Sequence, residues 1–248
     1  MPESNDHAGL TGGRANVISI DLSDKTVLLT GGDSPEARWA ALRFAAAGAN
    51  LVIQYEKEET SVGRVVDEIV KAGGKAEAFY ADLGNYQDAE RLTERIIKAC
   101  RRIDILVNTF THHSQVPFRE LTAEQWNDSL QHNLFSVYHI SRSVSRHMTE
   151  QEKGVIINIT SAIHFSGIGG GVDFSAAEAA VHGVTLAMAR ELTVKGLRVN
   201  AIAPSADLLK DQDAVGNFAV FLASALADRI SGEIFKLDGI PAQRGGTE

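Results

Sequence analysis

The sequence has a single cysteine, Cys100, among 248 residues. An internal disulfide framework is therefore excluded, and one free thiol fits a reducing compartment. The amino terminus, MPESNDHAGLTGGRAN, lacks the basic and apolar pattern of an export signal, and no apolar run is long enough to span a bilayer. We therefore expect a cytoplasmic protein with a flexible tail over residues 1–16.

Positive charge is also scarce. The chain has 24 Lys and Arg residues against 32 Asp and Glu residues, a formal net charge of −8. Binding to nucleic acid or to an anionic membrane requires a basic face, which this balance opposes. The composition predicts a small-molecule ligand of unknown identity, with no nucleic-acid partner and no membrane partner.

Short apolar runs rich in β-branched residues alternate with segments of helical spacing. This alternation predicts an α/β fold in three layers, with a doubly wound parallel sheet of about seven strands in one domain over residues 17–248. Ligands of such sheets bind at the carboxyl ends of the strands. The predicted strands are 26–30, 50–55, 76–81, 103–108, 154–160, 197–203 and 233–238, and the predicted helices are 35–47, 58–72, 87–101, 122–149, 174–195 and 212–227.

Six short motifs occur in order along the chain: TGG at 30–32, ADL at 81–83, DILVN at 104–108, HNLFSVY at 132–138, IINITS at 156–161 and RVNAIAP at 198–204. Together they resemble the short-chain dehydrogenase/reductase (SDR) superfamily over about residues 22–239. The resemblance implies a Rossmann-like fold and an oxidoreductase by descent. It also implies a nicotinamide dinucleotide, and a serine, tyrosine, lysine and asparagine set that moves hydride to or from a carbonyl carbon.

The first turn matches the family pattern TGxxxGxG only in part. Thr30 and Gly31 match, and the resemblance implies that they bind the cofactor. Pro35 and Ala37 stand where the second and third glycines belong. The second glycine allows the backbone to approach the pyrophosphate, whereas proline has a ring and no N–H.

The same turn carries acidic residues. Ser34, Pro35 and Glu36 form an ordinary helix opening, with a serine cap, a proline in the first position and an acid near the helix dipole. Asp33 adds a second carboxylate, and both carboxylates would repel a diphosphate. We predict a self-capped helix and weakened or absent dinucleotide binding.

The other cofactor positions are mixed. Asp82 and Asn108 match the family's adenine contact and its strand-end asparagine, so the resemblance implies that both bind the cofactor. Tyr55 ends the second predicted strand and Glu56 follows, where an NADP enzyme would favour a basic residue. The cofactor is therefore predicted to be NAD if any dinucleotide binds, and the absence of a cofactor is the alternative.

The catalytic set departs furthest from the family. Ser161 and Asn133 match its serine and its asparagine, whereas the tyrosine and lysine positions are Phe174 and Glu178. No tyrosine or lysine lies between Ser161 and Lys195. Phenylalanine has no proton to donate, and glutamate reverses the local charge. We predict that ordinary NAD(P)-dependent carbonyl reduction is lost, with Ser161, Asn133 and Glu178 as the candidate catalytic residues.

The segment that forms a lid over the substrate in the family is short. Only residues 205–211 lie between the RVNAIAP motif and the last predicted helix. So short a lid cannot exclude water from a pocket.

Three alternatives to an inactive SDR protein stay open. The first is a repurposed lyase, isomerase or hydrolase that uses Ser161, His164 and Glu178, with His112 and His113 near the same rim. The histidine spacing matches no recognised metal motif, so no metal is predicted. The second is an inactive subunit or scaffold of a hetero-oligomer, and the third is a residual NAD-dependent oxidoreductase. The helices at 122–149 and 174–195 correspond to the family's subunit contacts, so we expect a homodimer or homotetramer.

Overall fold

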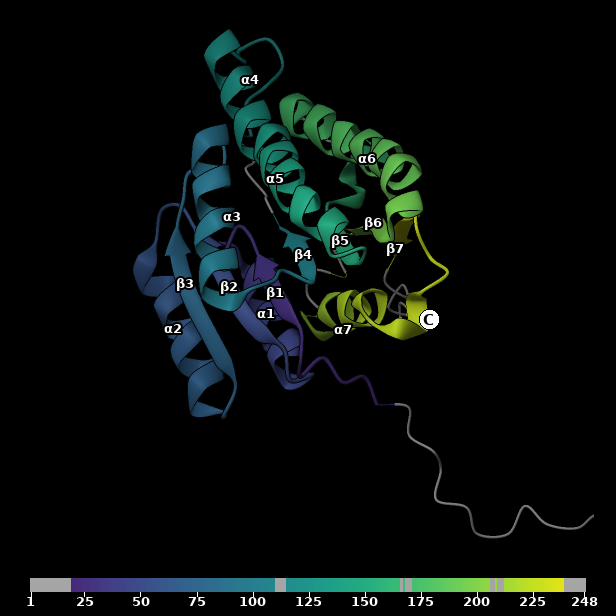
Figure 1. The fold of residues 1–248 in the computed structure, drawn as a ribbon. Coiled ribbons are helices and arrows are strands. Elements are labelled where there is room, and N and C mark those ends of the chain that lie inside the picture. Colours follow the sequence, from purple (N-terminus) through teal and green to yellow (C-terminus); the bar gives the residue numbers. More distant parts are fainter. Residues whose placement is uncertain are drawn as a thin grey trace, which may run out of the picture.

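The computed structural model describes residues 19–109, 115–165, 167, 171–205, 208 and 212–238. Its strands form one seven-stranded parallel sheet in the order β3-β2-β1-β4-β5-β6-β7 (Figure 1). The predicted α/β class and strand number are therefore confirmed. The strands are β1 (Thr26–Leu29), β2 (Asn50–Tyr55), β3 (Lys75–Tyr80), β4 (Ile105–Asn108), β5 (Gly154–Ile159), β6 (Leu197–Pro204) and β7 (Ile234–Leu237).

Helices cover both faces of the sheet. Helices α1, α2 and α7 pack on one face, and α3, α5 and α6 pack on the other (Figure 1). Successive residues of β1 point to opposite layers, because Val27 and Leu29 enter the first core and Leu28 enters the second. The α-helices are α1 (Pro35–Ala46), α2 (Glu59–Lys71), α3 (Tyr86–Cys100), α4 (Ala123–Leu130), α5 (Ser136–Glu150), α6 (Val172–Leu192) and α7 (Gln212–Ala223).

The helix predicted over 122–149 is not continuous. A π-helical turn, η1 (Gln131–Phe135), separates α4 from α5. The Asn133 side chain donates a hydrogen bond to the Ser129 carbonyl at 3.0 Å, which gives an acceptor of the distorted backbone a partner. The prediction of one uninterrupted helix over 122–149 is therefore wrong.

Smaller differences concern the last two predicted helices. Helix α6 ends at Leu192, and a 3₁₀ turn, η3 (Thr193–Lys195), leads into β6. Helix α7 ends at Ala223, and Ser224 then caps a separate 3₁₀ turn, η5 (Ala225–Ala227). A further 3₁₀ turn, η2 (Ala162–Phe165), follows β5. None of the helices within the described ranges is long and apolar enough to cross a bilayer.

Candidate functional site

A ladder of buried polar side chains joins the carboxyl ends of β1, β4 and β5. The Thr30 hydroxyl donates to Asn108 Oδ1 at 3.2 Å, and Asn108 Nδ2 donates to Asn158 Oδ1 at 2.8 Å. Asn158 Nδ2 continues the ladder to Thr185 Oγ1 on α6 at 2.8 Å, and Asn108 Nδ2 also reaches Ser141 Oγ on α5 at 3.2 Å. The ladder therefore connects the sheet to α5 and α6. It gives Thr30 and Asn108 a structural role, while their role as cofactor ligands stays a prediction.

The first turn lies directly against neighbouring backbone. Gly31 has a φ of +66°, and a Cβ added there would lie 2.8 Å from the Thr109 carbonyl oxygen. Its N–H donates to Gln54 Oε1 at 2.9 Å, and the Gly32 N–H donates to the Gln54 carbonyl at 2.8 Å. Both glycines are thus required by packing within the chain, and both of their N–H groups are already bound.

Helix α1 opens as the sequence predicts. Ser34 Oγ accepts the Ala37 N–H at 3.1 Å, and Pro35 is the first helical residue. Glu36 lies in the first turn of the helix, and its Oε2 atom is buried with no hydrogen-bond partner among the described residues. This buried oxygen would oppose the binding of an anion beside it.

The carboxylate of Asp33 binds the loop after β2, a contact that the sequence does not predict. Asp33 Oδ2 accepts the N–H of Glu56 at 2.8 Å and of Lys57 at 3.3 Å, and Oδ1 accepts the N–H of Glu58 at 2.8 Å. The signal in the sequence is indirect. Glu58 immediately precedes α2 and makes no side-chain cap hydrogen bond, so the helix needs an acceptor from elsewhere in the chain.

The loop after β2 also contacts η1. His132 Nε2 lies 3.4 Å from Glu56 Oε1. The Glu56 carboxylate raises the pKa of His132 to about 9, and His132 in turn lowers the pKa of Glu56. The pair links the end of β2 to η1, and it is charged at neutral pH.

These contacts do not fit the dinucleotide that the family resemblance implies. A pyrophosphate at a helix start is held by free backbone N–H groups. Here the N–H groups of Gly31, Gly32 and Ala37 have acceptors within the chain, and Pro35 has no N–H. The chain's own carboxylates occupy the positive end of α1 and the amides that precede α2.

At the end of β5, the structure brings Ser161 and Glu178 together. Glu178 Oε2 accepts the Ser161 N–H at 2.6 Å, and the Glu178 side chain is buried with 1% relative exposure. Burial raises the pKa of Glu178 to about 8, although the Ser161 N–H opposes this shift. The raised pKa favours the protonated carboxyl group at neutral pH.

The remaining side chains around this end of β5 are also packed. Phe174 is buried on the first turn of α6, and His182, also on α6, is buried with its Nε2 2.7 Å from the Thr160 hydroxyl. Asn133 is buried on η1, which packs against α6. Ser161 and Glu178 are thus in direct contact, while Asn133 acts on the backbone of its own helix.

Asp82 lies partly buried after β3. An aspartate at a strand end often caps the following helix, but α3 is capped by Asn85, whose Oδ1 accepts the Gln87 N–H at 2.9 Å. The assignment of Asp82 as an adenine ligand stays a prediction. His112, His113 and most of the segment 205–211 lie outside the described residues, as does the side chain of His164. Within the described ranges, no group of three or more His, Cys, Asp or Glu side chains could hold a metal ion.

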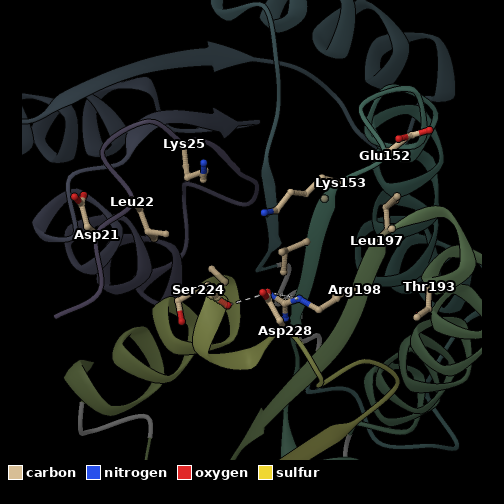
Figure 2. A pocket seen from close by; sticks show the side chains of 15 residues that line it. Asp21, Leu22, Lys25, Glu152, Lys153, Thr193, Leu197, Arg198, Ser224 and Asp228 are labelled. Carbon is tan, nitrogen blue, oxygen red and sulfur yellow. Dashed lines mark hydrogen bonds and ion pairs between the residues drawn. The ribbon is translucent and has the colours of Figure 1, made fainter. Parts of the chain in front are cut away.

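A cavity of about 430 Å³ lies at the opposite edge of the sheet, where β5 and β6 begin (Figure 2). Its buried cation is Arg198, which donates to the Leu222 carbonyl at 2.7 Å and to the Ser224 carbonyl at 3.2 Å. Arg198 Nε also lies 3.8 Å from Asp228 Oδ1. These contacts neutralise and bind the guanidinium, so the carboxyl edge is the better candidate for a ligand site.

A seven-stranded parallel sheet in this strand order, with helices on both faces, defines a doubly wound α/β fold. Residues 25–207 match the family model described as short chain dehydrogenase. This match covers most of the chain, so the chain belongs to the short-chain dehydrogenase/reductase family. Dehydrogenases of this family generally use nicotinamide dinucleotides.

Three similar proteins carry the names of reductases or dehydrogenases. The chain is 34% identical over 183 residues to a 3-oxoacyl-(acyl-carrier-protein) reductase of Synechocystis sp., covering 74% of each chain. It is 28% identical over 239 residues to the enzyme of the same name from Staphylococcus epidermidis, covering 87% of this chain and 98% of that one. Acetoin dehydrogenase from Enterobacter cloacae has the same fold, with a TM-score of 0.81 and 25% identity over 87% of this chain and 94% of that one.

Proposed function

We propose that this chain is an SDR-family protein that has lost ordinary NAD(P)-dependent carbonyl reduction. One observation carries the proposal: the family's tyrosine and lysine positions hold Phe174 and Glu178, both buried in packed surroundings. A general acid contributes about 10²–10⁴ to the rate of such a reaction. Phe174 has no ionisable group, and Glu178 cannot act as the cation that lowers the pKa of a neighbouring phenol.

The proposal includes weakened dinucleotide binding, with NAD favoured over NADP. The hydrogen bonds already made by the N–H groups of Gly31, Gly32 and Ala37 support it, as do the carboxylates of Asp33 and Glu36. Calorimetric titration with NAD, NADH, NADP and NADPH tests this part. We expect dissociation constants of about a millimolar or weaker, and micromolar binding of any of the four would overturn it.

A repair experiment separates the two defects. Phe174→Tyr combined with Glu178→Lys restores the family's residue types at the end of β5 but leaves the first turn unchanged. We expect no reduction of simple ketones or aldehydes by the double variant, because the dinucleotide still lacks a place to bind. Consumption of NADH or NADPH by the double variant would show that the first turn is competent, and turnover by the natural sequence would refute the proposal as a whole.

A second candidate, a residual NAD-dependent oxidoreductase, is favoured by the names of the relatives. It also has a chemical basis, because a carboxyl group with a pKa of about 8 beside the Ser161 N–H is a possible proton donor at neutral pH. In this candidate, Glu178→Gln removes the donor and abolishes turnover. NADH consumption that falls more than about 100-fold in Glu178→Gln would favour this candidate over the first.

The oligomeric state is part of the proposal. The outer face of α6 carries exposed Val172 and Leu186, and the neighbouring η1 and α5 carry exposed Phe135 and Tyr138. Apolar groups exposed on adjacent helices support a homodimer or homotetramer. Sedimentation velocity on the pure protein tests it. A monomer at micromolar concentration would contradict it, and co-purification in a fixed ratio with a second SDR chain would favour the hetero-oligomer instead.

A further inference from the structure

We infer that the Asp33 carboxylate acts as an internal substitute for a ligand phosphate, so that this chain rejects nucleotides that carry a 2′-phosphate on the ribose. The inference rests on the proposed weakening of dinucleotide binding and names the residue responsible at the ribose end. The residues at the carboxyl edge that carry it do not fit the family's cofactor.

The amides that Asp33 binds form a site for one anion. The N–H groups of Glu56, Lys57 and Glu58 converge on its two oxygens at 2.8, 3.3 and 2.8 Å. They stand just before α2, where backbone N–H groups have no partner within the helix and the helix dipole is positive. Successive N–H groups of this kind bind phosphate groups as readily as carboxylates.

The position of this cluster matches the ribose end of the family's nucleotide site. In doubly wound sheets, the residues after the second strand contact the adenosine ribose, and the choice between a 2′-hydroxyl and a 2′-phosphate is made there. Strands β1 and β2 are paired neighbours, so Asp33 needs to cross only one strand spacing. The Gly32 turn lies directly on β2, since a Cβ at Gly32 would lie 2.6 Å from Ile53 Cγ2. This close approach holds Asp33 over the amides.

The surrounding charges strengthen the exclusion. Residues 56–59 read EKEE, so a single lysine faces three glutamates. Glu56 is paired with His132, which anchors the loop to η1. A 2′-phosphate would have to displace Asp33 from its three N–H donors while remaining close to its negative charge, and both effects oppose binding.

The test compares adenosine 2′,5′-bisphosphate with 5′-AMP by calorimetry. For the natural sequence, we expect adenosine 2′,5′-bisphosphate to bind more weakly than 5′-AMP, because Asp33 occupies the amides and repels the 2′-phosphate. Asp33→Ala vacates the amides, so the bisphosphate should bind at least about tenfold tighter than to the natural sequence, while 5′-AMP changes by less than about threefold. Asp33→Asn removes the charge but keeps one oxygen acceptor, so it should show an intermediate gain and guards against a folding defect in Asp33→Ala.

Asp67→Ala is the matched control, because Asp67 is an exposed acid on α2, the helix that follows the amides bound by Asp33, and lies away from its first turn. It makes the same change in net charge and should not alter either affinity. The inference is refuted if neither Asp33 variant gains bisphosphate affinity, if Asp67→Ala gains as much, or if the natural sequence already prefers the bisphosphate. Micromolar binding of NAD by the natural sequence would instead refute the proposed function and leave the bisphosphate ratio as a separate result.

Discussion

Two carboxyl groups at the same edge of the sheet meet very different surroundings. Asp33, at the β1–β2 end of the site, is partly exposed and accepts three backbone N–H groups. Glu178, at the β5 end, is fully buried and accepts one, with its pKa raised to about 8 by burial. Glu178 has a single N–H donor in a buried site, and burial favours its neutral form.

Under the proposed function, the two ends of the site differ from the family pattern in chemically opposite ways. At the β1–β2 end, a fixed negative charge takes the place of a ligand anion. At the β5 end, a neutral acid takes the place of a cation. The polar ladder between them, from Thr30 through Asn108 to Asn158, is complete. Both ends could therefore change while the support beneath them stayed intact.

The largest expected effect concerns the protonation state of Glu178 in the folded protein. Because the folded pKa of about 8 exceeds the unfolded value of 4.5, the folded protein retains a proton that the unfolded chain releases. Stability should therefore fall as pH rises from about 4.5 to 8, by up to about 1.4 kcal/mol per unit. Glu178→Gln cannot ionise, and it should gain on the order of 3 kcal/mol relative to the natural sequence between pH 5 and pH 8.

The measurement for this prediction is urea unfolding at several pH values. Glu191→Gln is the control, because Glu191 is an exposed acid on the same helix. Its stability should follow that of the natural sequence at every pH. Parallel curves for the natural sequence and Glu178→Gln would mean that Glu178 is ionised in the folded protein, and the contrast with Asp33 would disappear.

A smaller effect, about 2 kcal/mol, is expected in the ladder that supports both ends. Asn158→Ala removes one acceptor of Asn108 and one donor to Thr185 in a buried setting, so two polar groups each lose one partner. Urea unfolding of Asn158→Ala should show a lower midpoint with an unchanged slope. Asn127→Ala, at an exposed position on α4, should lie within about 0.5 kcal/mol of the natural sequence. A neutral Asn158→Ala would show that the ladder does not support the site.

The sequence predicts the layers, the strands and the local helix opening at Ser34, because these depend on periodicity and on neighbours within one turn. It does not predict the Asp33 contacts, which join residues 23 to 25 positions apart, since nothing local distinguishes an aspartate that binds distant amides from a solvated one. The sequence also does not predict the protonation state of Glu178, because the burial of this side chain depends on how α6 packs over β5. The sequence therefore predicts contacts within one helical turn, but not contacts between residues that are distant in the chain.

The smallest expected effect concerns the ion pair that holds the β2 loop beside Asp33. His132 has a folded pKa of about 9, above its ordinary value of 6.5, so its contribution is complete below about pH 6.5 and is lost as pH rises through about 9. Because the 3.4 Å separation is long and water reaches both side chains, we expect His132→Gln to lower stability by only about 1 kcal/mol at pH 6.5. The difference should vanish near pH 10, whereas His147→Gln, at a partly exposed position on α5, should have little effect at either pH. A His132→Gln deficit that persists unchanged at pH 10 would mean that the imidazole acts through packing and not through charge. The β2 loop would then be held by the Asp33 carboxylate alone.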